Sequence, residues 1–172
     1  MPKLILLTGP GGAGKTTTAN KIATESSGIW AHVPQDDIRY FIKAGFAHPA
    51  KEWTEQTKKQ WDISVKISCD MARDYYKNGV NCIVDGFISH AKFDEWREAL
   101  AGVKFKLFVL HPTEETTLKR NAQRSGSARL LDETIKSHHD IFKLWQDVPE
   151  AVIIDNSNMS VEEVVDKIKS LM

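Results

Sequence analysis

A glycine-rich stretch near the amino terminus constrains the fold more than any other part of the chain. Residues 3–18 read KLILLTGPGGAGKTTT, in which a short apolar run leads into the spacing Gly-x-x-x-x-Gly-Lys-Thr at residues 9–16. Main-chain N–H groups can wrap a polyphosphate closely only where no Cβ intrudes, which favours glycine at such positions. The apolar run before the motif and the helix-compatible run after it are the context that a phosphate-binding loop requires. The alternative is a glycine-rich turn in an ordinary α/β unit.

The residues of this motif have separate expected roles toward ATP and Mg²⁺. Lys15 is expected to reach the β- and γ-phosphates as a point charge, and Thr16 to place its hydroxyl on Mg²⁺. A helix that begins near Gly14 directs its positive end at the anion. We therefore expect the nucleotide to be bound by the residues of this loop, namely Gly9, Gly11, Gly12, Ala13, Gly14, Lys15, Thr16 and Thr17.

Length and charge limit the class of protein. A chain of 172 residues with 41% hydrophobic content suits a single domain, residues 1–172. Lys plus Arg and Asp plus Glu both number 23, so the net charge gives no support for nucleic acid or an anionic membrane as a partner. Two isolated cysteines suit a reducing compartment, and the first apolar run is too short for a signal peptide or a membrane span. We therefore expect a cytoplasmic protein.

Short apolar runs alternate with helix-compatible segments along the chain. The expected strands are Lys3–Thr8, Trp30–Pro34, Asn81–Asp85, Lys104–Leu110 and Ala151–Asp155. The expected helices are Lys15–Glu25, Ile38–Ala44, Glu52–Lys77, Phe93–Leu100, Glu114–Arg124, Leu131–Gln146 and Val161–Leu171. This alternation predicts an α/β fold with a parallel sheet, helices on both faces and right-handed crossovers. The ligand site is then expected outside the carboxyl ends of the strands.

An acidic pair follows the second expected strand, in the segment Gln35-Asp36-Asp37-Ile38-Arg39. An acceptor hydroxyl that attacks a γ-phosphoryl group needs a fixed position and a destination for its proton, and one carboxylate beside the phosphate loop supplies both. We expect Asp36 in this role and Asp37 to be mainly structural, but the assignment between them stays open because Asp is also a preferred N-cap. Arg39 is expected to hold an anionic or polyhydroxylated acceptor, or to balance the carboxylates.

The third expected strand ends in Asp85. In a phosphate-loop fold an acid at this point holds Mg²⁺ directly or through water, or orients the acceptor; the alternative is a cap for the next element. Trp53 and Trp61, which lie between the two acidic segments, are either core residues or part of an acceptor pocket.

A basic segment at residues 119–129 is the fourth candidate. Arg120 and Arg124 are four residues apart, so both are expected on one helix face. A hinged helical lid at about residues 119–130 can bring cations to the transferring group once water has been expelled. Arg129 follows the Ser-Gly-Ser at residues 125–127, and the alternative for the whole segment is a solvated helix end. Asn156, after the last strand, is either a purine contact or a turn residue.

Together these motifs resemble the small P-loop kinases, a group that includes polynucleotide kinase, zeta-toxin, chloramphenicol phosphotransferase and gluconate kinase-like proteins. The resemblance covers nearly the whole chain. The residues that carry it are the loop at 9–16, the Asp36-Asp37-x-Arg39 pattern and the lid-like segment Leu118–Arg124. It implies a three-layer P-loop NTPase fold with a five-stranded sheet in the order 2-3-1-4-5.

The same resemblance implies roles for individual residues. It makes Asp36 the acid that activates the acceptor, Arg39 an acceptor contact, and Arg120 and Arg124 lid arginines. The Asp-Gly-Phe at residues 85–87 is also similar to the nucleoside monophosphate kinases, but Ile88-Ser89 stands where that group has Pro-Arg. This departure argues against a nucleoside monophosphate as the acceptor.

The sequence therefore predicts an ATP- and Mg²⁺-dependent kinase that transfers the γ-phosphoryl group to a hydroxyl of a small molecule or of a nucleotide. A nucleic-acid 5′-hydroxyl end also fits the chemistry, although the net charge does not support it. No Asn-Lys-x-Asp guanine motif is present, which argues against a GTPase. An ATPase or regulator without an acceptor and a toxin-like nucleotide-sugar kinase both stay open. The sequence does not indicate the oligomeric state.

Overall fold

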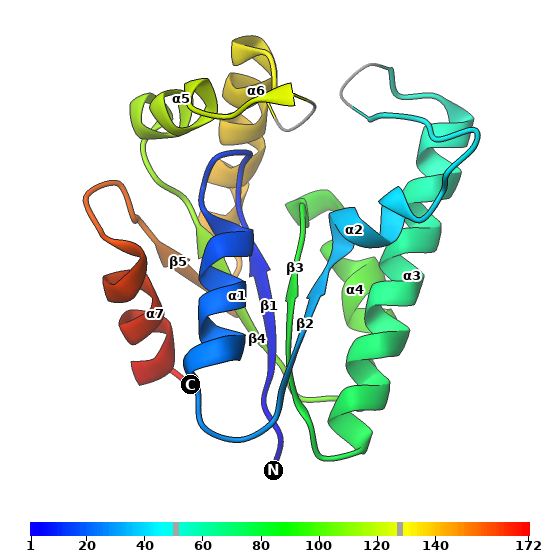
Figure 1. Cartoon of the computed structure of the whole chain (residues 1–172), viewed down its shortest axis with the longest axis vertical. Coiled ribbons are helices and arrows are strands. Elements are labelled where there is room, and N and C mark those ends of the chain that lie inside the picture. The colour runs from blue at the N-terminus through cyan, green and yellow to red at the C-terminus, as the bar shows by residue number, and fades with distance from the viewer. Residues whose placement is uncertain (50–51, 127–128) are drawn as a thin grey trace.

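The computed structural model describes residues 1–49, 52–126 and 129–172. Within those residues five strands form one parallel sheet in the order β2-β3-β1-β4-β5 (Figure 1). The order implied by the resemblance is therefore confirmed. The strands are β1 (Leu4–Thr8), β2 (Trp30–Pro34), β3 (Asn81–Asp85), β4 (Lys106–Leu110) and β5 (Ala151–Ile154).

The connecting segments are mostly helical, as the alternating pattern predicts. The helices are α1 (Lys15–Glu25), α2 (Gln35–Tyr40), α3 (Glu55–Lys77), α4 (Phe93–Ala99), α5 (Glu114–Ala122), α6 (Asp132–Lys143) and α7 (Val161–Ser170), with 3₁₀ turns at His90–Lys92 and Leu144–Asp147. The largest difference from prediction is at α2, which begins at Gln35 directly after the strand and ends at Tyr40, rather than spanning residues 38–44.

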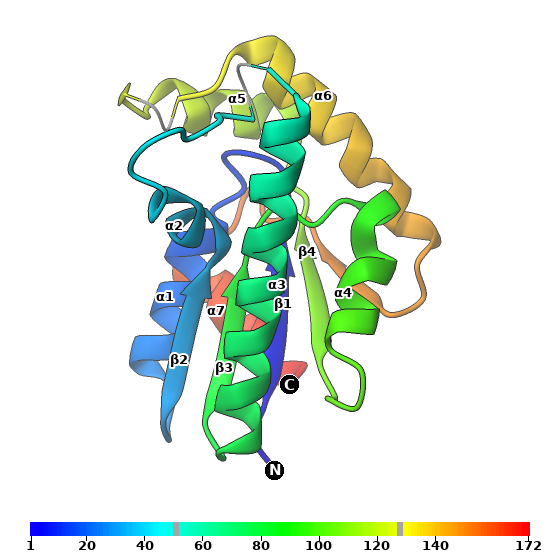
Figure 2. The ribbon, with the colours of Figure 1, turned by 90° about the vertical axis from the view of Figure 1, so that its right-hand side faces the viewer.

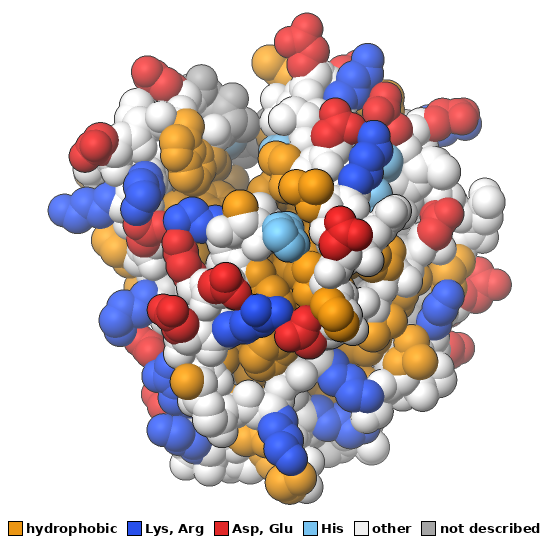
Figure 3. Space-filling model, turned by 180° about the vertical axis from the view of Figure 1, so that it is seen from behind, with side chains coloured by type: hydrophobic (Ala, Val, Ile, Leu, Met, Phe, Trp, Pro, Cys, Tyr) orange, Lys and Arg blue, Asp and Glu red, His pale blue; other side chains and the backbone are white. Residues whose placement is uncertain are grey.

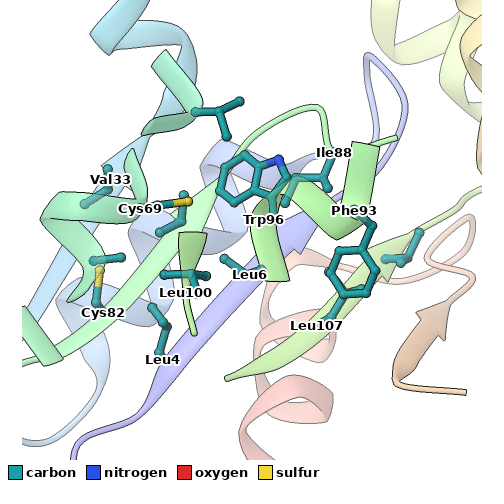
Figure 4. Packing of buried hydrophobic residues seen from close by; sticks show 14 of the residues in the cluster. Leu4, Leu6, Val33, Cys69, Cys82, Ile88, Phe93, Trp96, Leu100 and Leu107 are labelled. Carbon is teal, nitrogen blue, oxygen red and sulfur yellow. The ribbon is translucent and has the colours of Figure 1, made fainter. Parts of the chain in front are cut away.

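Two hydrophobic layers enclose the sheet because neighbouring residues of a strand point to opposite faces. In β1, Leu4 and Leu6 contribute to one layer, and Ile5 and Leu7 to the other. The first layer lies against α3 and α4, and the second against α1 and α7 (Figure 2). Figure 4 shows Trp96 of α4 close to Leu6 and Ile88 in the first layer.

The strand register brings the carboxyl ends of β1, β2 and β3 together. Leu7 of β1 and Pro34 of β2 are both paired with Asp85, the last residue of β3. Thr8 extends this connection, since its hydroxyl donates to the Ile88 carbonyl (3.2 Å) and accepts from the Ile88 N–H (2.9 Å). The phosphate-loop motif, α2 and the segment after β3 therefore all begin at one edge of the sheet.

An apolar hollow of about 540 Å³ lies at the opposite edge of the sheet. Its lining includes Leu4 at the start of β1, Lys106 at the start of β4, and Phe93 and Arg97 of α4. Figure 3 shows the back of the molecule, where hydrophobic and charged side chains lie side by side on the surface. The hollow is remote from the glycine-rich loop, because that loop follows the last residue of β1.

None of the helices in the described part of the chain has the length and hydrophobicity needed to cross a membrane.

Trp96 tests the core assignment, with Trp53 as a matched control. Trp96 is 1% exposed and Trp53 is 57% exposed. We expect Trp96→Ala to lower the free energy of unfolding by about 3–5 kcal/mol, because it removes a large buried side chain and leaves a cavity. Trp53→Ala is expected to change it by less than about 1 kcal/mol. Urea unfolding followed by far-UV circular dichroism measures both, and equal losses would contradict the assignment.

Candidate functional site

The loop between β1 and α1 passes so close to other backbone segments that side chains are excluded. A Cβ on Gly9 would lie 2.2 Å from the carbonyl oxygen of Leu110, the last residue of β4. A Cβ on Gly12 would lie 2.9 Å from the carbonyl oxygen of Thr117 in α5. Both glycines also have positive φ angles, +151° and +86°, which L side chains rarely adopt. The motif therefore forms a tight loop that only glycine can build at these positions.

Lys15 begins α1 and folds back over the loop. Its Nζ donates to the carbonyl oxygens of Gly9 (2.8 Å) and Pro10 (3.0 Å). Burial lowers the pKa of the Lys15 ammonium, the carboxylates of Asp85 and Asp36 oppose this decrease, and the charge of Arg124 adds to it. The three charged groups that influence the pKa of Lys15 lie on β3, on α2 and in the segment after α5. The structure therefore brings four predicted site residues together around the loop.

Asp85 joins three elements at the edge of the sheet. Thr16 of α1 donates from its hydroxyl to Asp85 Oδ2 (2.7 Å), and His32 of β2 donates from Nε2 to Asp85 Oδ1 (2.5 Å). The Asp85 side chain is 4% exposed, so both of its oxygens are held in a largely buried position. A hydroxyl and a carboxylate oxygen this close together are a donor set that suits Mg²⁺, which prefers oxygen ligands and retains several waters.

Sequence reasoning missed His32, because it lies within the second expected strand and belongs to none of the motifs described above. The available signal was a polar residue inside an apolar strand. Pro34 is paired with Asp85, so His32, two residues earlier, points to the same face of the sheet. That inference needs β2 and β3 to be neighbours, which the residue pattern alone does not establish.

Asp36 and Arg39 form an ion pair within α2. Arg39 donates from Nη1 to Asp36 Oδ1 (2.8 Å), and the two side chains are 7% and 66% exposed respectively. The guanidinium carbon of Arg39 lies 4.9 Å from the ring centre of Trp61 and 5.6 Å from that of Phe46. Arg39 is thus buried between aromatic rings, and its charge is directed at Asp36. Of the two roles expected for Arg39, this geometry matches the balancing of a carboxylate. Asp37 is exposed on the same helix.

The start of α2 is anchored by Gln35, which is fully buried. Its Nε2 donates to the Ser64 hydroxyl in α3 (3.1 Å). A Cβ on Gly86 would lie 2.3 Å from Gln35 Oε1, so the glycine after Asp85 leaves the space that Gln35 occupies. This contact fixes Asp36, the next residue, relative to the end of β3.

The basic segment differs from its expected form, because α5 ends at Ala122 and Arg124 lies beyond the helix. The expectation that Arg120 and Arg124 share a helix face is therefore wrong. The physical reason is Asn121, whose side chain donates to the Leu130 carbonyl (2.8 Å) and accepts from the Leu130 N–H (3.0 Å), closing the chain back on itself. Residues 127–128 of the expected lid lie outside the described residues, and Arg129 is exposed.

Arg120 and Asn156 meet on the side of the loop near β5. Arg120 donates from Nη2 to the Asn156 carbonyl oxygen (2.9 Å), and Asn156 donates from Nδ2 to the Ala13 carbonyl oxygen (2.9 Å). Ala13 is fully buried, whereas Thr17 is exposed on α1. The structure therefore connects the segment after β5 both to the loop and to α5.

Gly9 tests the steric constraint, with Gly102 as a matched control. Both have positive φ, but a Cβ on Gly102 meets nothing within 4 Å. We expect Gly9→Ala to lower the free energy of unfolding by at least about 1 kcal/mol more than Gly102→Ala, because the Leu110 carbonyl is part of a paired strand and cannot move aside. Urea unfolding measures the difference. Equal effects would mean that the loop can relax around a side chain.

Comparison with known structures supports this description of the fold. A tunicamycin resistance protein from Deinococcus radiodurans aligns with a TM-score of 0.73 and 18% identity, over 99% of this chain and 95% of that one. A sugar kinase from Janibacter sp. HTCC2649 aligns with a TM-score of 0.71 and 16% identity, over 99% and 94%. A gluconokinase from Sinorhizobium meliloti 1021 aligns with a TM-score of 0.69 and 16% identity, over 96% and 89%.

These likenesses confirm the fold of the small P-loop kinases that the sequence resembles. A search of curated proteins found no match. A family model described as an AAA domain matches residues 4–145, which include the phosphate loop, both acidic segments and the basic segment. The chain therefore belongs to this AAA-domain family.

Proposed function

We propose that the protein is an ATP- and Mg²⁺-dependent kinase that transfers the γ-phosphoryl group to a hydroxyl of a small molecule or a nucleotide. The observation that carries the proposal is the grouping of Lys15, Thr16 and Asp85 at the tight glycine loop, where the Thr16 hydroxyl donates to Asp85 Oδ2 at 2.7 Å. Asp36, Asp85 and Arg124 all influence the pKa of Lys15, although they are far from it in sequence. An acid for the acceptor, an acid for the metal and a cation for the phosphates thus share one loop, as phosphoryl transfer requires.

The proposed nucleotide and metal roles follow from the contacts of the loop. The glycine loop and Lys15 hold the phosphates, and Asn156 and Arg120 lie on the side toward β5, where we place the base. Thr16 and Asp85 hold Mg²⁺ through their adjacent oxygens. When bound, Mg²⁺ neutralises charge on the β- and γ-phosphates.

Asp36 activates the acceptor in this proposal. Its carboxylate is the exposed partner of the pair with Arg39, and Oδ2 is not used by that contact. Arg39 keeps Oδ1 in place, so it acts as a positioning residue for Asp36. A hydroxyl that approaches Oδ2 can hand over its proton as the oxygen attacks phosphorus.

We place the acceptor beside aromatic rings that lie just before α3, on α3 and after β3. Trp53 and Trp61 have ring centres 5.8 Å apart, and Trp61 contacts Phe87 edge-on at 6.2 Å. Trp61 also lies against Arg39, so these rings continue from the acid toward the end of β3. This arrangement favours the acceptor-pocket alternative for Trp53, which stays 57% exposed.

Arg124 and Arg120 supply cations on the other side of the loop. Arg124 lowers the pKa of Lys15, so its charge reaches the phosphate end of the site. Arg120 is held at the Asn156 carbonyl. We propose that the segment at 119–130 is the lid and that its arginines stabilise the charge on the transferring group.

A screen for phosphoryl transfer tests the function. Purified protein is incubated with γ-labelled ATP, Mg²⁺ and panels of sugars, antibiotics, nucleosides and 5′-hydroxyl oligonucleotides. We expect label in one acceptor class and loss of nearly all transfer in Lys15→Ala, with Lys21→Ala as a surface lysine control on the same helix. ATP hydrolysis indifferent to every acceptor would instead favour an ATPase or regulator.

Asp36→Asn separates catalysis from binding. The asparagine can still accept from Arg39 but cannot take a proton, so we expect transfer to slow by at least about a hundredfold. The affinity for an ATP analogue should change by less than about threefold. Steady-state kinetics and calorimetric titration measure the two quantities. Asp37→Asn is the control, and a slow Asp37→Asn beside an unimpaired Asp36→Asn would move the role by one residue.

A further inference from the structure

His138 on α6 is a half-buried residue beside the phosphate loop that the proposed roles do not use. A Cβ on Gly11 would lie 3.7 Å from His138 Nδ1 and 3.1 Å from the end of Ile135. Ile135 and His138 are three residues apart, so one face of α6 rests on the loop. This face is otherwise apolar, since Ile135 and Phe142 are fully buried.

The Nδ1 atom of His138 is buried and has no hydrogen-bond partner among the described residues. An unpaired buried polar atom is unfavourable and rare in folded proteins, so it calls for an explanation. The ring itself is fixed by packing, because its centre lies 4.5 Å from that of Phe87, two residues after Asp85. His138 is therefore held at the loop by apolar contacts while its nitrogen there is unpaired.

Burial and nearby charges determine the protonation state of His138. Burial, with a smaller contribution from Lys15, lowers the pKa of His138 to about 4. Asp85 on β3, Asp36 on α2 and Arg124 after α5 act on the same lysine. On α6 itself, Asp140 is paired with Lys143 at the surface. The imidazole is thus neutral near pH 7 next to a cation that polyphosphate is expected to bind.

We propose that His138 is a phosphate-binding residue of the nucleotide site, which takes up a proton when a nucleoside triphosphate fills the loop and donates from Nδ1 to a phosphate oxygen. The inference rests on the proposed function. A polyphosphate beside Lys15 replaces net positive charge with negative charge near the ring, which favours the imidazolium. The hydrogen bond to phosphate then gives the buried nitrogen its missing partner.

The proposal fixes the sign of a pH dependence. Because complex formation raises the pKa of His138, the contribution of His138 to nucleotide binding is complete below the pKa of about 4 in the free protein, and it is lost as pH rises to the pKa of the complex. The nucleotide also titrates in this range, so the contribution of His138 is taken as the difference between the wild type and His138→Gln, which cannot titrate. His90→Gln is the control, because His90 is exposed and its ring packs on Trp145.

Calorimetry measures the proton directly. A non-hydrolysable ATP analogue with Mg²⁺ is titrated at pH 6.5 in two buffers of different ionisation enthalpy. We expect the wild type and His90→Gln to take up at least about half a proton more than His138→Gln. Equal uptake by all three proteins would overturn the proposal.

Nuclear magnetic resonance of histidine-labelled wild type gives a second measurement that depends on no variant. The His138 ring signals, assigned through the backbone, should show a neutral ring without nucleotide and an imidazolium with it, both at pH 6.5. A neutral ring in the complex would overturn the role of His138 and leave the proposed function intact. Failure of the wild type to bind the analogue at all would overturn both.

Discussion

The close approach of Gly9 and Gly12, in the loop between β1 and α1, to neighbouring backbone is the constraint on which the rest of the site depends. Gly9 faces the carbonyl oxygen of Leu110, and Gly12 faces that of Thr117. These oxygens belong to the backbone of β4 and α5, so they cannot move aside as a flexible side chain would. The loop is consequently fixed against the sheet on one side and against α5 on the other. Arg120 and Arg124 follow Thr117 in the chain, so any motion of these arginines starts from the close approach of Thr117 to Gly12.

Asp85 links the end of the sheet to the start of α1 through hydrogen bonds. Its two oxygens accept from Thr16 of α1 and His32 of β2, so one carboxylate connects three elements that meet only at their carboxyl ends. In the proposed function Mg²⁺ retains several waters, and a contact through water leaves the hydrogen bond from His32 in place. The charge of Asp85 also opposes the effect of burial on Lys15. A single buried acid thus accepts from the Thr16 hydroxyl and favours the charged form of Lys15, the residues proposed to bind the metal and the phosphates.

The sequence predicted those parts of the fold and site that depend on short segments. The strand before the loop, the glycines and the acids at strand ends are local patterns, and parallel strands bring their carboxyl ends to one edge. The sheet order came from the family resemblance, because no residue pattern decides which strands are neighbours. The contacts His32–Asp85 and Gln35–Ser64 span 53 and 29 residues and depend on that order. The end of α5 was misplaced because Asn121 pairs with Leu130, a contact that helix propensity does not contain.

Charged residues couple the phosphate loop to the basic segment that follows α5. Lys15 and Arg124 repel one another, since the charge of Arg124 lowers the pKa of Lys15. The carboxylates of Asp85 and Asp36 offset this repulsion from the other side. A polyphosphate in the loop would turn the two cations from mutual repulsion to attraction toward a common anion. In the proposed function, nucleotide binding would then favour the approach of Arg124 to the loop, because the charges of Arg124 and Lys15 would both be attracted to the phosphates.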